Sequence, residues 1–367
     1  MARQIHELPV WTRFYWNLDG LAATLAAVRH KQGRLLGHME ALAFSLQEEA
    51  QLEALTLDVL KSSEIEGENL NADEVRSAVA RRLGMDIAGA VPAGREVEGV
   101  VETMLDATQN FDKPLTKERL FRWHAALFPT ARSDMSKLMV GGWRSEAEGP
   151  MQAVSAPAGK EQEAPAASLL DREMSWFMAW VNETGSMDLV FRSALTHLQF
   201  VTIHPFDDGN GRIARAIADW FLARSENSAQ RFYSLSAQIR QEQKAYYDIL
   251  ERTQKGTLDI TPWMEWFLGC LDRAIDATET TLAAVLRKAR FWERLADTGI
   301  NDRQFFVLNR MLGGLEGKLT STRWASIGNC SHDTALRDIQ YLVDKDVLVK
   351  NPAGGRSTSY SLKGIEG

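Results

Sequence analysis

The residues from His204 to Arg215, which read HPFDDGNGRIAR, have the types and the spacing that phosphate chemistry needs. His204 is the side chain in this stretch that can take up a proton near neutral pH. Asp208 offers the carboxylate oxygens that Mg²⁺ prefers. Arg212 and Arg215 are three residues apart, so on a helix both guanidinium groups can hold one polyphosphate. The stretch therefore predicts a phosphate site with a general base and a metal-binding carboxylate.

A helix is predicted to begin inside this stretch, because apolar residues recur at helical spacing directly after it. They are Ile213, Ala216, Ile217, Trp220 and Phe221. Gly209, Asn210 and Gly211 then lie at the start of the helix, where the first amides have no partner within the helix and can bind an anion. The two glycines let the backbone approach that anion closely. We therefore expect these three residues to bind phosphate together with the two arginines.

Two other phosphate-binding patterns fit the sequence less well or not at all. Residues 209–214 match the dinucleotide pattern GxGxxA, but that pattern needs a buried strand before it, and His-Pro-Phe-Asp-Asp is not one. The Walker A pattern GxxxxGK[ST] occurs nowhere in the sequence.

The composition is typical of a soluble globular protein. The 367 residues are 45% hydrophobic and 25% charged, so two to three domains with a sizeable core are expected. A net charge of -7 gives no general attraction to nucleic acid or to anionic membranes. Cys270 and Cys330 lie in no metal or redox spacing and are interpreted as reduced thiols. Because neither a signal-peptide pattern nor an apolar run of about 18 residues is present, a cytoplasmic location is predicted.

The stretch HPFDDGNGRIAR resembles, position for position, the HPFx[DE]GNGRxxR signature of the Fic family. That family mostly transfers a nucleoside monophosphate, usually AMP from ATP, onto a hydroxyl side chain of a protein. The GNGR form is similar to the AMP-transferring branch, since the related Doc phosphotransferases carry Lys where Gly211 stands. The resemblance implies ATP and Mg²⁺ as ligands and His204, Asp208 and Arg212 as catalytic residues. It also implies Asp208 as the metal carboxylate and Arg215 as a further phosphate ligand.

An acidic helix end at residues 62–67, SSEIEG, gains meaning beside that signature. It resembles the inhibitory motif [ST]xxxE[GN] of Fic proteins, which implies an inhibitory role for Ser62, Glu66 and Gly67. The helix itself is predicted over residues 49–66, with Gly67 as the left-handed residue that ends it. A carboxylate at a helix C-terminus is unfavourable against the helix dipole, so Glu66 needs a partner. We predict that this partner is Arg215 and that the pair blocks the place of the γ-phosphate.

Residues 140–144 and 151–155 flank a polar turn and predict a two-stranded hairpin. In Fic proteins a hairpin at this place forms a flap that holds the target segment by main-chain pairing. By this resemblance, Trp143 and Arg144 are candidates for target binding.

A helix is predicted over residues 234–250, after the motif helix. Its residues Gln241, Tyr246 and Tyr247 are candidates for contacts with the adenine and ribose of ATP. Core packing is an equally good interpretation of the two tyrosines. Two histidines outside the motif, His124 and His197, are predicted to be packed in the core, with His197 orienting its neighbours.

The predicted fold is mainly α: a Fic-like helical core with a β-hairpin flap, an N-terminal helical region and a C-terminal winged-helix-like domain. The predicted domains are an N-terminal helical region with the inhibitory helix (1–95), a catalytic domain (96–270), a helical bridge (271–300) and a winged-helix-like domain (301–367).

The last of these domains is predicted from short helices near 302–313, 321–328 and 332–345, strands at 347–349 and 359–362, and a glycine turn at 354–356. They resemble a winged helix whose recognition helix is 333–345. Residues 301–362 hold eight Lys/Arg against six Asp/Glu, a balance too neutral for strong DNA binding. Protein contact or homodimer packing is favoured over DNA.

The function predicted from these features is protein adenylylation, the transfer of AMP from ATP to a Ser, Thr or Tyr hydroxyl of a target protein or of the chain itself, with Glu66 as inhibitor. Two alternatives remain open at this point. The same site can remove AMP from a modified protein, with Glu66 orienting the attacking water. Alternatively, the chain is a transcriptional regulator that binds DNA through residues 301–362.

Overall fold

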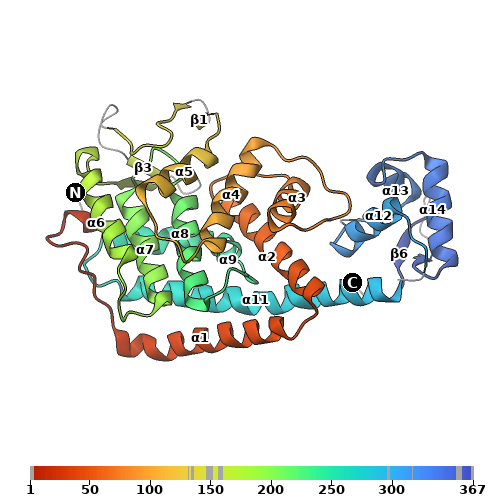
Figure 1. The fold of residues 1–367 in the computed structure, drawn as a ribbon, viewed down its shortest axis with the longest axis horizontal. Helices are drawn as coiled ribbons and strands as arrows, with labels where there is room; N and C mark the ends of the chain where they lie inside the picture. The colour runs from red at the N-terminus through yellow and green to blue at the C-terminus, as the bar shows by residue number, and fades with distance from the viewer. Residues whose placement is uncertain are drawn as a thin grey trace. The chain divides into compact units, whose positions relative to one another are not determined.

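The computed structural model describes residues 4–130, 132–133, 136–145, 152–155, 160–295, 298–315, 317–352 and 358–364. The fold is mainly helical, as the sequence predicts (Figure 1). The chain divides into two compact units, Met1–Met85 with Val91–Leu282 and Asp86–Ala90 with Ala283–Gly367. Among the residues described, no helix is both long and apolar enough to cross a membrane. The predicted domain boundaries stay a prediction, and the division between the units falls inside one long helix.

The first unit consists of helices and two antiparallel pairs of short strands. Its helices are α1 (Leu18–Glu40), α2 (Phe44–Ile65), α3 (Ala72–Leu83), α4 (Arg95–Gln109), α5 (Lys117–Leu127), α6 (Leu170–Asn182), α7 (Leu189–Ile203), α8 (Asn210–Glu226), α9 (Leu235–Gln241), α10 (Gln243–Gln254) and the first part of α11 (Thr261–Arg294), with 3-10 turns at Ile5–Glu7 and Ala167–Leu169. Its strands are β1 (Arg132–Ser133), paired with β2 (Ser136–Lys137), and β3 (Gln152–Ser155), paired with β4 (Lys160–Glu163).

Helices α7 and α8 form the centre of this unit and pack along each other (Figure 1). Every residue of α7 from Val190 to Ile203 is buried, and so is nearly every residue of α8 up to Ala223. Helix α4 packs on α8, and α2 packs on α3 and α9. The stretch HPFDDGNGRIAR therefore connects the two most buried helices of the unit, so its backbone is anchored at both ends.

Helix α2 ends as the sequence predicts. Gly67 has a φ of +88°, which a side chain would strain. Its amide donates to the carbonyl oxygen of Glu64, and the amide of Glu68 donates to that of Ser63. These two bonds form a Schellman motif, which satisfies the last carbonyls of the helix. The motif also turns the chain sharply, so Glu66 and Glu68 lie on either side of one glycine.

Two helices end where no local sequence signal marks an end. Helix α1 ends at Glu40, and in the turn that follows the amide of Leu42 donates to the carbonyl oxygen of Met39. The predicted helix over residues 234–250 is two helices, α9 and α10, which meet at Glu242. The carboxylate of Glu242 is paired with Arg273 of α11 at 2.6 Å. Neither the end of α1 nor the junction of α9 and α10 has a glycine or proline that would predict it.

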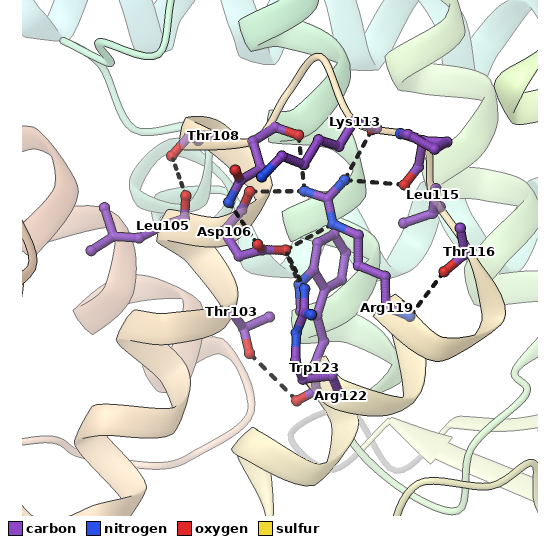
Figure 2. A network of polar contacts seen from close by, with 12 residues as sticks. Thr103, Leu105, Asp106, Thr108, Lys113, Leu115, Thr116, Arg119, Arg122 and Trp123 are labelled. Carbon is purple, nitrogen blue, oxygen red and sulfur yellow. Dashed lines mark hydrogen bonds and ion pairs between the residues drawn. The ribbon is translucent and has the colours of Figure 1, made fainter.

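A buried arginine joins the end of α4 to α5 (Figure 2). The guanidinium of Arg119 donates to the carbonyl oxygens of Asp106, Asn110 and Lys113, which satisfies acceptors at the C-terminus of α4. It also donates to the carboxylate of Asp106 at 2.8 Å, and the indole of Trp123 donates to the same carboxylate at 2.7 Å. Burial alone would raise the pKa of Asp106, but these partners outweigh it and lower that pKa. The network holds α5 in place beside the motif loop.

The short strands differ from the predicted hairpin. The sequence predicts pairing between residues 140–144 and 151–155, whereas β3, within the latter segment, pairs with β4. Residues 140–144 form a turn and an extended segment in which Gly141 has a φ of +71° and donates its amide to Nδ1 of His124. Packing of Trp143 on aromatic rings of the first unit holds this segment, and strand patterns do not reveal such contacts.

The second unit has the predicted order of elements. They are α12 (Asp302–Leu312), α13 (Ser321–Ile327), α14 (His332–Asp344), β5 (Leu348–Lys350) and β6 (Tyr360–Leu362), with β5 antiparallel to β6. The core of this unit is centred on Trp324, whose indole donates to the buried carboxylate of Asp338, and it includes Phe291 and Leu295. The predicted turn at 354–356 lies outside the described residues, and the winged-helix assignment stays a prediction.

Candidate active site

The end of α7 places His204 in an unusual backbone conformation. His204 has a φ of +50°, in the left-handed region, and its amide donates to the carbonyl of Phe200. A residue with a side chain in this region costs about 1–3 kcal/mol unless the surroundings hold it. Part of that support comes from Asn210, whose side-chain amide accepts from the amide of Phe206 and donates to its carbonyl. Asn210 thus closes the loop between the two central helices.

The imidazole of His204 is suited to accept a proton. Its pKa is lowered to about 4, mainly by burial and further by the charge of Arg144. The carbonyl of Val201 and the carboxylates of Asp208 and Glu66 oppose this shift. The ring is therefore neutral at pH 7. Since one ring nitrogen is hydrogen-bonded to Val201, the other keeps a lone pair for proton transfer.

The start of α8 offers backbone donors beside His204. Gly209 has a φ of +78° and precedes the helix, so the amides of Asn210, Gly211 and Arg212 belong to the first turn and have no partner within the helix. The amide of Gly209 already has a partner, since it donates to its neighbour Asp208 at 2.5 Å. The amides of residues 210–212 are therefore the candidates for anion binding, which stays a prediction.

Arg215 is buried and contacts Ser62 and Glu66 at the end of α2, as predicted. Its Nη2 donates to the carboxylate of Glu66 at 2.7 Å and to the carbonyl of Ser62 at 2.9 Å. Its Nε donates to the hydroxyl of Ser62 at 2.9 Å. Glu66 also lies against the first turn of α8, because a Cβ added to Gly211 would meet its Oε1 at 2.3 Å. The predicted contact between Glu66 and Arg215 is therefore present.

Arg212 pairs with a second carboxylate, which the sequence analysis missed. Its Nη1 donates to Glu68 at 2.6 Å, and its guanidinium lies 5.0 Å from the ring centre of Phe128. The signal in the sequence was Glu66-Gly67-Glu68. A glycine in the left-handed region between two carboxylates lets both side chains reach the same helix, here α8. Both arginines of the motif thus hold a carboxylate from the turn after α2.

The residues of this site fit a nucleotide polyphosphate with its metal ion. Nε of Arg212 and Nη1 of Arg215 are buried without a hydrogen-bond partner of good geometry among the described residues, and a phosphate oxygen would satisfy such donors. Asp208 is half-buried at the start of α8, and Mg²⁺ in proteins commonly takes one or two carboxylates together with substrate phosphates. Over the described part of the chain no group of three or more His, Cys, Asp or Glu is placed to hold a metal ion.

Two of the three nucleoside candidates, Tyr246 and Tyr247, lie on α10 near Arg215. Tyr246 is buried, and its hydroxyl is 2.8 Å from Nε2 of His197. Both residues are therefore packed in the core, which was one of the two interpretations of Tyr246. Burial raises the pKa of Tyr247 to about 12, with Glu66 adding to the effect. Gln241 is exposed at the end of α9. Gln243, which the sequence analysis missed, donates to the carbonyl of Ile65 at the end of α2.

Trp143 and Arg144 lie under the motif loop. The indole of Trp143 packs on Phe206 with ring centres 5.1 Å apart. The guanidinium of Arg144 is buried and donates to carbonyls of the chain itself, including that of His204 at 2.7 Å. His124 stacks on Phe206 and is fully buried, as predicted, and burial lowers its pKa to about 4. The guanidinium of Arg144 is thus engaged by its own chain, and the expected role of Trp143 and Arg144 in target binding stays a prediction.

Comparison with known families covers most of the first unit. Residues 114–222 match the Fic/DOC family, and residues 4–85 match a domain of unknown function, DUF4172. The chain carries a Fic/DOC family domain. The matched part contains α5 to α7 and most of α8, hence the whole HPFDDGNGRIAR loop, and the DUF4172 part contains α2 with Glu66.

Curated relatives of the Fic domain are similar over part of their length. The protein adenylyltransferase Fic of Culex quinquefasciatus is 34% identical over 105 residues, which are 28% of this chain and 19% of the relative. That of Nematostella vectensis is 32% identical over 115 residues, 31% of this chain and 25% of the relative. A uridine 5′-monophosphate transferase of Xanthomonas campestris pv. campestris is 33% identical over 119 residues, 30% of this chain and 21% of the relative. The chain thus matches about a fifth to a quarter of each relative.

Solved structures of Fic proteins share the fold. A Fic family protein from Desulfovibrio desulfuricans has a TM-score of 0.54 at 21% identity and covers 95% of this chain and 97% of its own. A Fic domain signaling protein from Bacteroides thetaiotaomicron has a TM-score of 0.52 at 19% identity, over 71% of this chain and 97% of its own. The Fic helical fold is therefore confirmed for this chain.

Proposed function

We propose that the chain is a protein adenylyltransferase that transfers AMP from ATP to a Ser, Thr or Tyr hydroxyl of a target protein or of itself, and that Glu66 inhibits it. The observation that carries this proposal is the neutral imidazole of His204 in a loop that leads directly into α8, the helix that carries the two buried arginines. The names of the curated relatives, which include two protein adenylyltransferases, agree with a nucleotidyl transfer.

His204 is the base of the proposed reaction. Its free ring nitrogen takes the proton from the target hydroxyl as that oxygen bonds to the α-phosphorus of ATP. The bond from the α-phosphorus to the bridging oxygen breaks at the same time, and pyrophosphate leaves with the electron pair. The products are AMP on the target side chain, pyrophosphate and one proton on His204, which passes to solvent. A base of this kind typically contributes ~10²–10⁴-fold in rate.

The start of α8 holds the phosphates in the proposed reaction. The amides of residues 210–212 face the charge that moves to the leaving group, and such preorganised donors stabilise it. Arg212 and Arg215 hold the β- and γ-phosphates so that pyrophosphate leaves in line. Mg²⁺ that arrives with ATP would be held by Asp208 and would neutralise phosphate charge.

Glu66 inhibits by holding Arg215. The carboxylate lies 2.7 Å from Nη2 of that arginine and places negative charge where the γ-phosphate has to go. Ser62 stabilises the Glu66–Arg215 pair, because its hydroxyl and its carbonyl both accept hydrogen bonds from the same guanidinium. ATP that binds without Arg215 has its α-phosphorus out of line with the target hydroxyl, and a misplacement of this kind costs about 10²-fold.

The test is the incorporation of labelled nucleotide by wild type and by Glu66→Gly, with cell lysate as the source of targets and mass spectrometry to find the modified residues. We expect Glu66→Gly to incorporate about 10²-fold more AMP than wild type. Adding His204→Ala to that variant should abolish incorporation while leaving ATP binding intact. Equal incorporation by wild type and Glu66→Gly would contradict the inhibitory role.

Two further arms separate the alternatives. Labelled UTP in place of ATP distinguishes adenylyl from uridylyl transfer, which is of interest because one relative is named a uridine 5′-monophosphate transferase. Purified AMP-protein incubated with Mg²⁺ but without ATP tests the removal of AMP. Loss of label that depends on Glu66 would favour hydrolysis, since a carboxylate at this position can orient water.

A further inference from the structure

Three consecutive carbonyls at the end of α7 face one buried arginine. Nε of Arg144 donates to the carbonyl of His204 at 2.7 Å, and its Nη2 lies 3.5 Å from that of Ile203. The backbone amide of Arg144 donates to the carbonyl of Pro205 at 2.9 Å. Nη2 also donates to Pro165, which lies just before α6. One residue thus binds every peptide from Ile203 to Pro205.

This arrangement meets a need that the loop cannot meet itself. The last carbonyls of a helix have no partner within it, and Pro205 has no amide with which to close a turn. His204 occupies the left-handed region and persists there only if its surroundings hold it. A guanidinium at a helix C-terminus is favourable toward the helix dipole and satisfies the free acceptors. Because Arg144 is only 5% exposed, water does not compete for these bonds.

We propose that Arg144 is a positioning residue for His204, and that it fixes the peptide on either side of the base so that the imidazole stays directed at the start of α8. The inference rests on the proposed role of His204 as base. It also replaces the expectation that Arg144 binds a target, because the guanidinium faces carbonyls of its own chain. Arg144 itself does not touch the reacting atoms.

The same unit offers a matched control, since other buried arginines cap helix ends away from the site. Arg192 is 6% exposed and donates to the carbonyls of Trp180 and Glu183 at 2.5 Å, at the end of α6. Arg119 does the same at the end of α4 (Figure 2). Loss of Arg192 costs a helix cap of the same kind but leaves the His204 loop untouched. The comparison therefore separates positioning from general stability.

The experiment compares Arg144→Met, Arg144→Lys and Arg192→Met, each in the Glu66→Gly background. The first readout is hydrogen exchange of peptides that span residues 200–208, which needs no activity. The second is the kcat of transfer together with the dissociation constant and stoichiometry of ATP binding, so that kcat is counted per folded site. Lysine can reach a single carbonyl and so serves as the conservative variant.

For Arg144→Met we expect faster exchange at His204 and a kcat about 100-fold lower, with ATP binding unchanged. Arg144→Lys should restore most of the slow exchange and most of the kcat. It also provides a folded variant for the test if Arg144→Met does not fold. Arg192→Met should leave the exchange rate of residues 200–208 and the kcat per site as they are in the Glu66→Gly background. Unchanged exchange in Arg144→Met, or equal effects in Arg144→Met and Arg192→Met, would overturn the proposal. If Glu66→Gly transfers no nucleotide, the proposed function fails, while the exchange readout still decides the positioning.

Discussion

Two carboxylates separated by one glycine occupy the two arginines of the Fic motif. Glu66 holds Arg215 and Glu68 holds Arg212, at 2.7 and 2.6 Å. The two differ in setting, because the side chain of Glu68 is 44% exposed while that of Glu66 is 26% exposed. Burial, together with the charges of Asp208 and Glu66, raises the pKa of Glu68 against the opposing charge of Arg212. Glu68 is thus the more easily displaced of the two.

We predict that Glu68→Gln, in the Glu66→Gly background, lowers the KM for ATP and leaves kcat unchanged. The reason is that a carboxylate on Arg212 competes with the phosphate that the arginine is proposed to hold. For a pair this exposed the gain is ~0.2–1 kcal/mol, or about 1.5- to 5-fold in KM. Steady-state kinetics of AMP incorporation measure it.

Glu64→Gln is the control for that prediction. Glu64 lies in the same helix end but pairs with Lys61 at 2.7 Å and touches neither motif arginine. An equal shift of KM in both variants would mean that general charge, and not the contact with Arg212, is responsible.

The central contacts of the site were predictable from sequence to different degrees. Glu66 was predictable because a carboxylate at a helix end needs a partner, and Arg215 stood at the right place in a recognisable motif. Glu68 was not, since an acidic residue after a helix usually lies in solvent. The contacts of Arg144 with backbone carbonyls were not predictable either. A sequence pattern shows which residues are charged but not which carbonyl groups they contact.

At the scale of elements, helices α4 and α5 approach each other closely at Gly99. A Cβ added to Gly99 would lie 1.7 Å from the carbonyl oxygen of Ala126, so the two backbones touch there. This contact and the Arg119 network in Figure 2 hold α5, and through it His124, against the motif loop. The position of α5 thus depends on the absence of a side chain at Gly99 and on the guanidinium of Arg119.

We predict that Gly99→Ala destabilises the protein by about 1–3 kcal/mol, because the added methyl group forces the two helices apart. Gly37→Ala, in the exposed face of α1 with nothing near its Cβ, should instead stabilise by roughly 0.5–1 kcal/mol. Urea unfolding followed by tryptophan fluorescence measures both. A Gly99→Ala variant as stable as wild type would show that the approach of α4 to α5 is not required.

Helices were predicted well where a local signal marks their ends. Gly67 ends a helix as predicted, since it acts through bonds to its nearest neighbours in the chain. The break at Glu242 was missed, since no local signal marks it and the partner of Glu242, Arg273, is 31 residues away in the chain. The strand pairing after residue 151 was also missed, since pairing depends on the partner and not on the strand alone.

At the scale of the whole molecule, acid is expected to destabilise the fold through three histidines. The pKa values of His124, His197 and His204 are lowered to about 4, 3 and 4, chiefly by burial, while an unfolded histidine titrates near 6.5. Between about pH 6.5 and 4 the unfolded chain therefore binds protons that the folded chain does not. Stability falls as pH falls through this window, by up to about 1.4 kcal/mol per pH unit for each histidine.

Urea titrations at a series of pH values measure this slope. His197→Gln should reduce the slope, because it removes one of the three groups. A stability that stays constant from pH 7 to 4.5 would contradict the expectation.

The division of the chain predicts where it can be cut. A chain that ends at Leu282 contains all helices of the first unit up to the boundary inside α11. A chain that ends at residue 300 also carries Phe291 and Leu295, which belong to the core of the second unit and would lose their cover. We expect the shorter chain to be soluble and to retain nucleotide binding, and the longer one to bind a hydrophobic dye. Loss of helical circular dichroism beyond the deleted share in the shorter chain would contradict this boundary.

The order of contacts along the chain has a consequence for synthesis. Glu66 precedes Arg215 by 149 residues, and Glu68 precedes Arg212 by 144. At ~5–20 residues per second the ribosome releases the carboxylates roughly 7–30 seconds before their arginines appear. Both carboxylates have therefore been synthesised before the motif helix can form, so the two ion pairs can close as soon as that helix folds. We expect the two arginines to be paired with Glu66 and Glu68 from the first folding of the unit, at any nucleotide concentration around the ribosome.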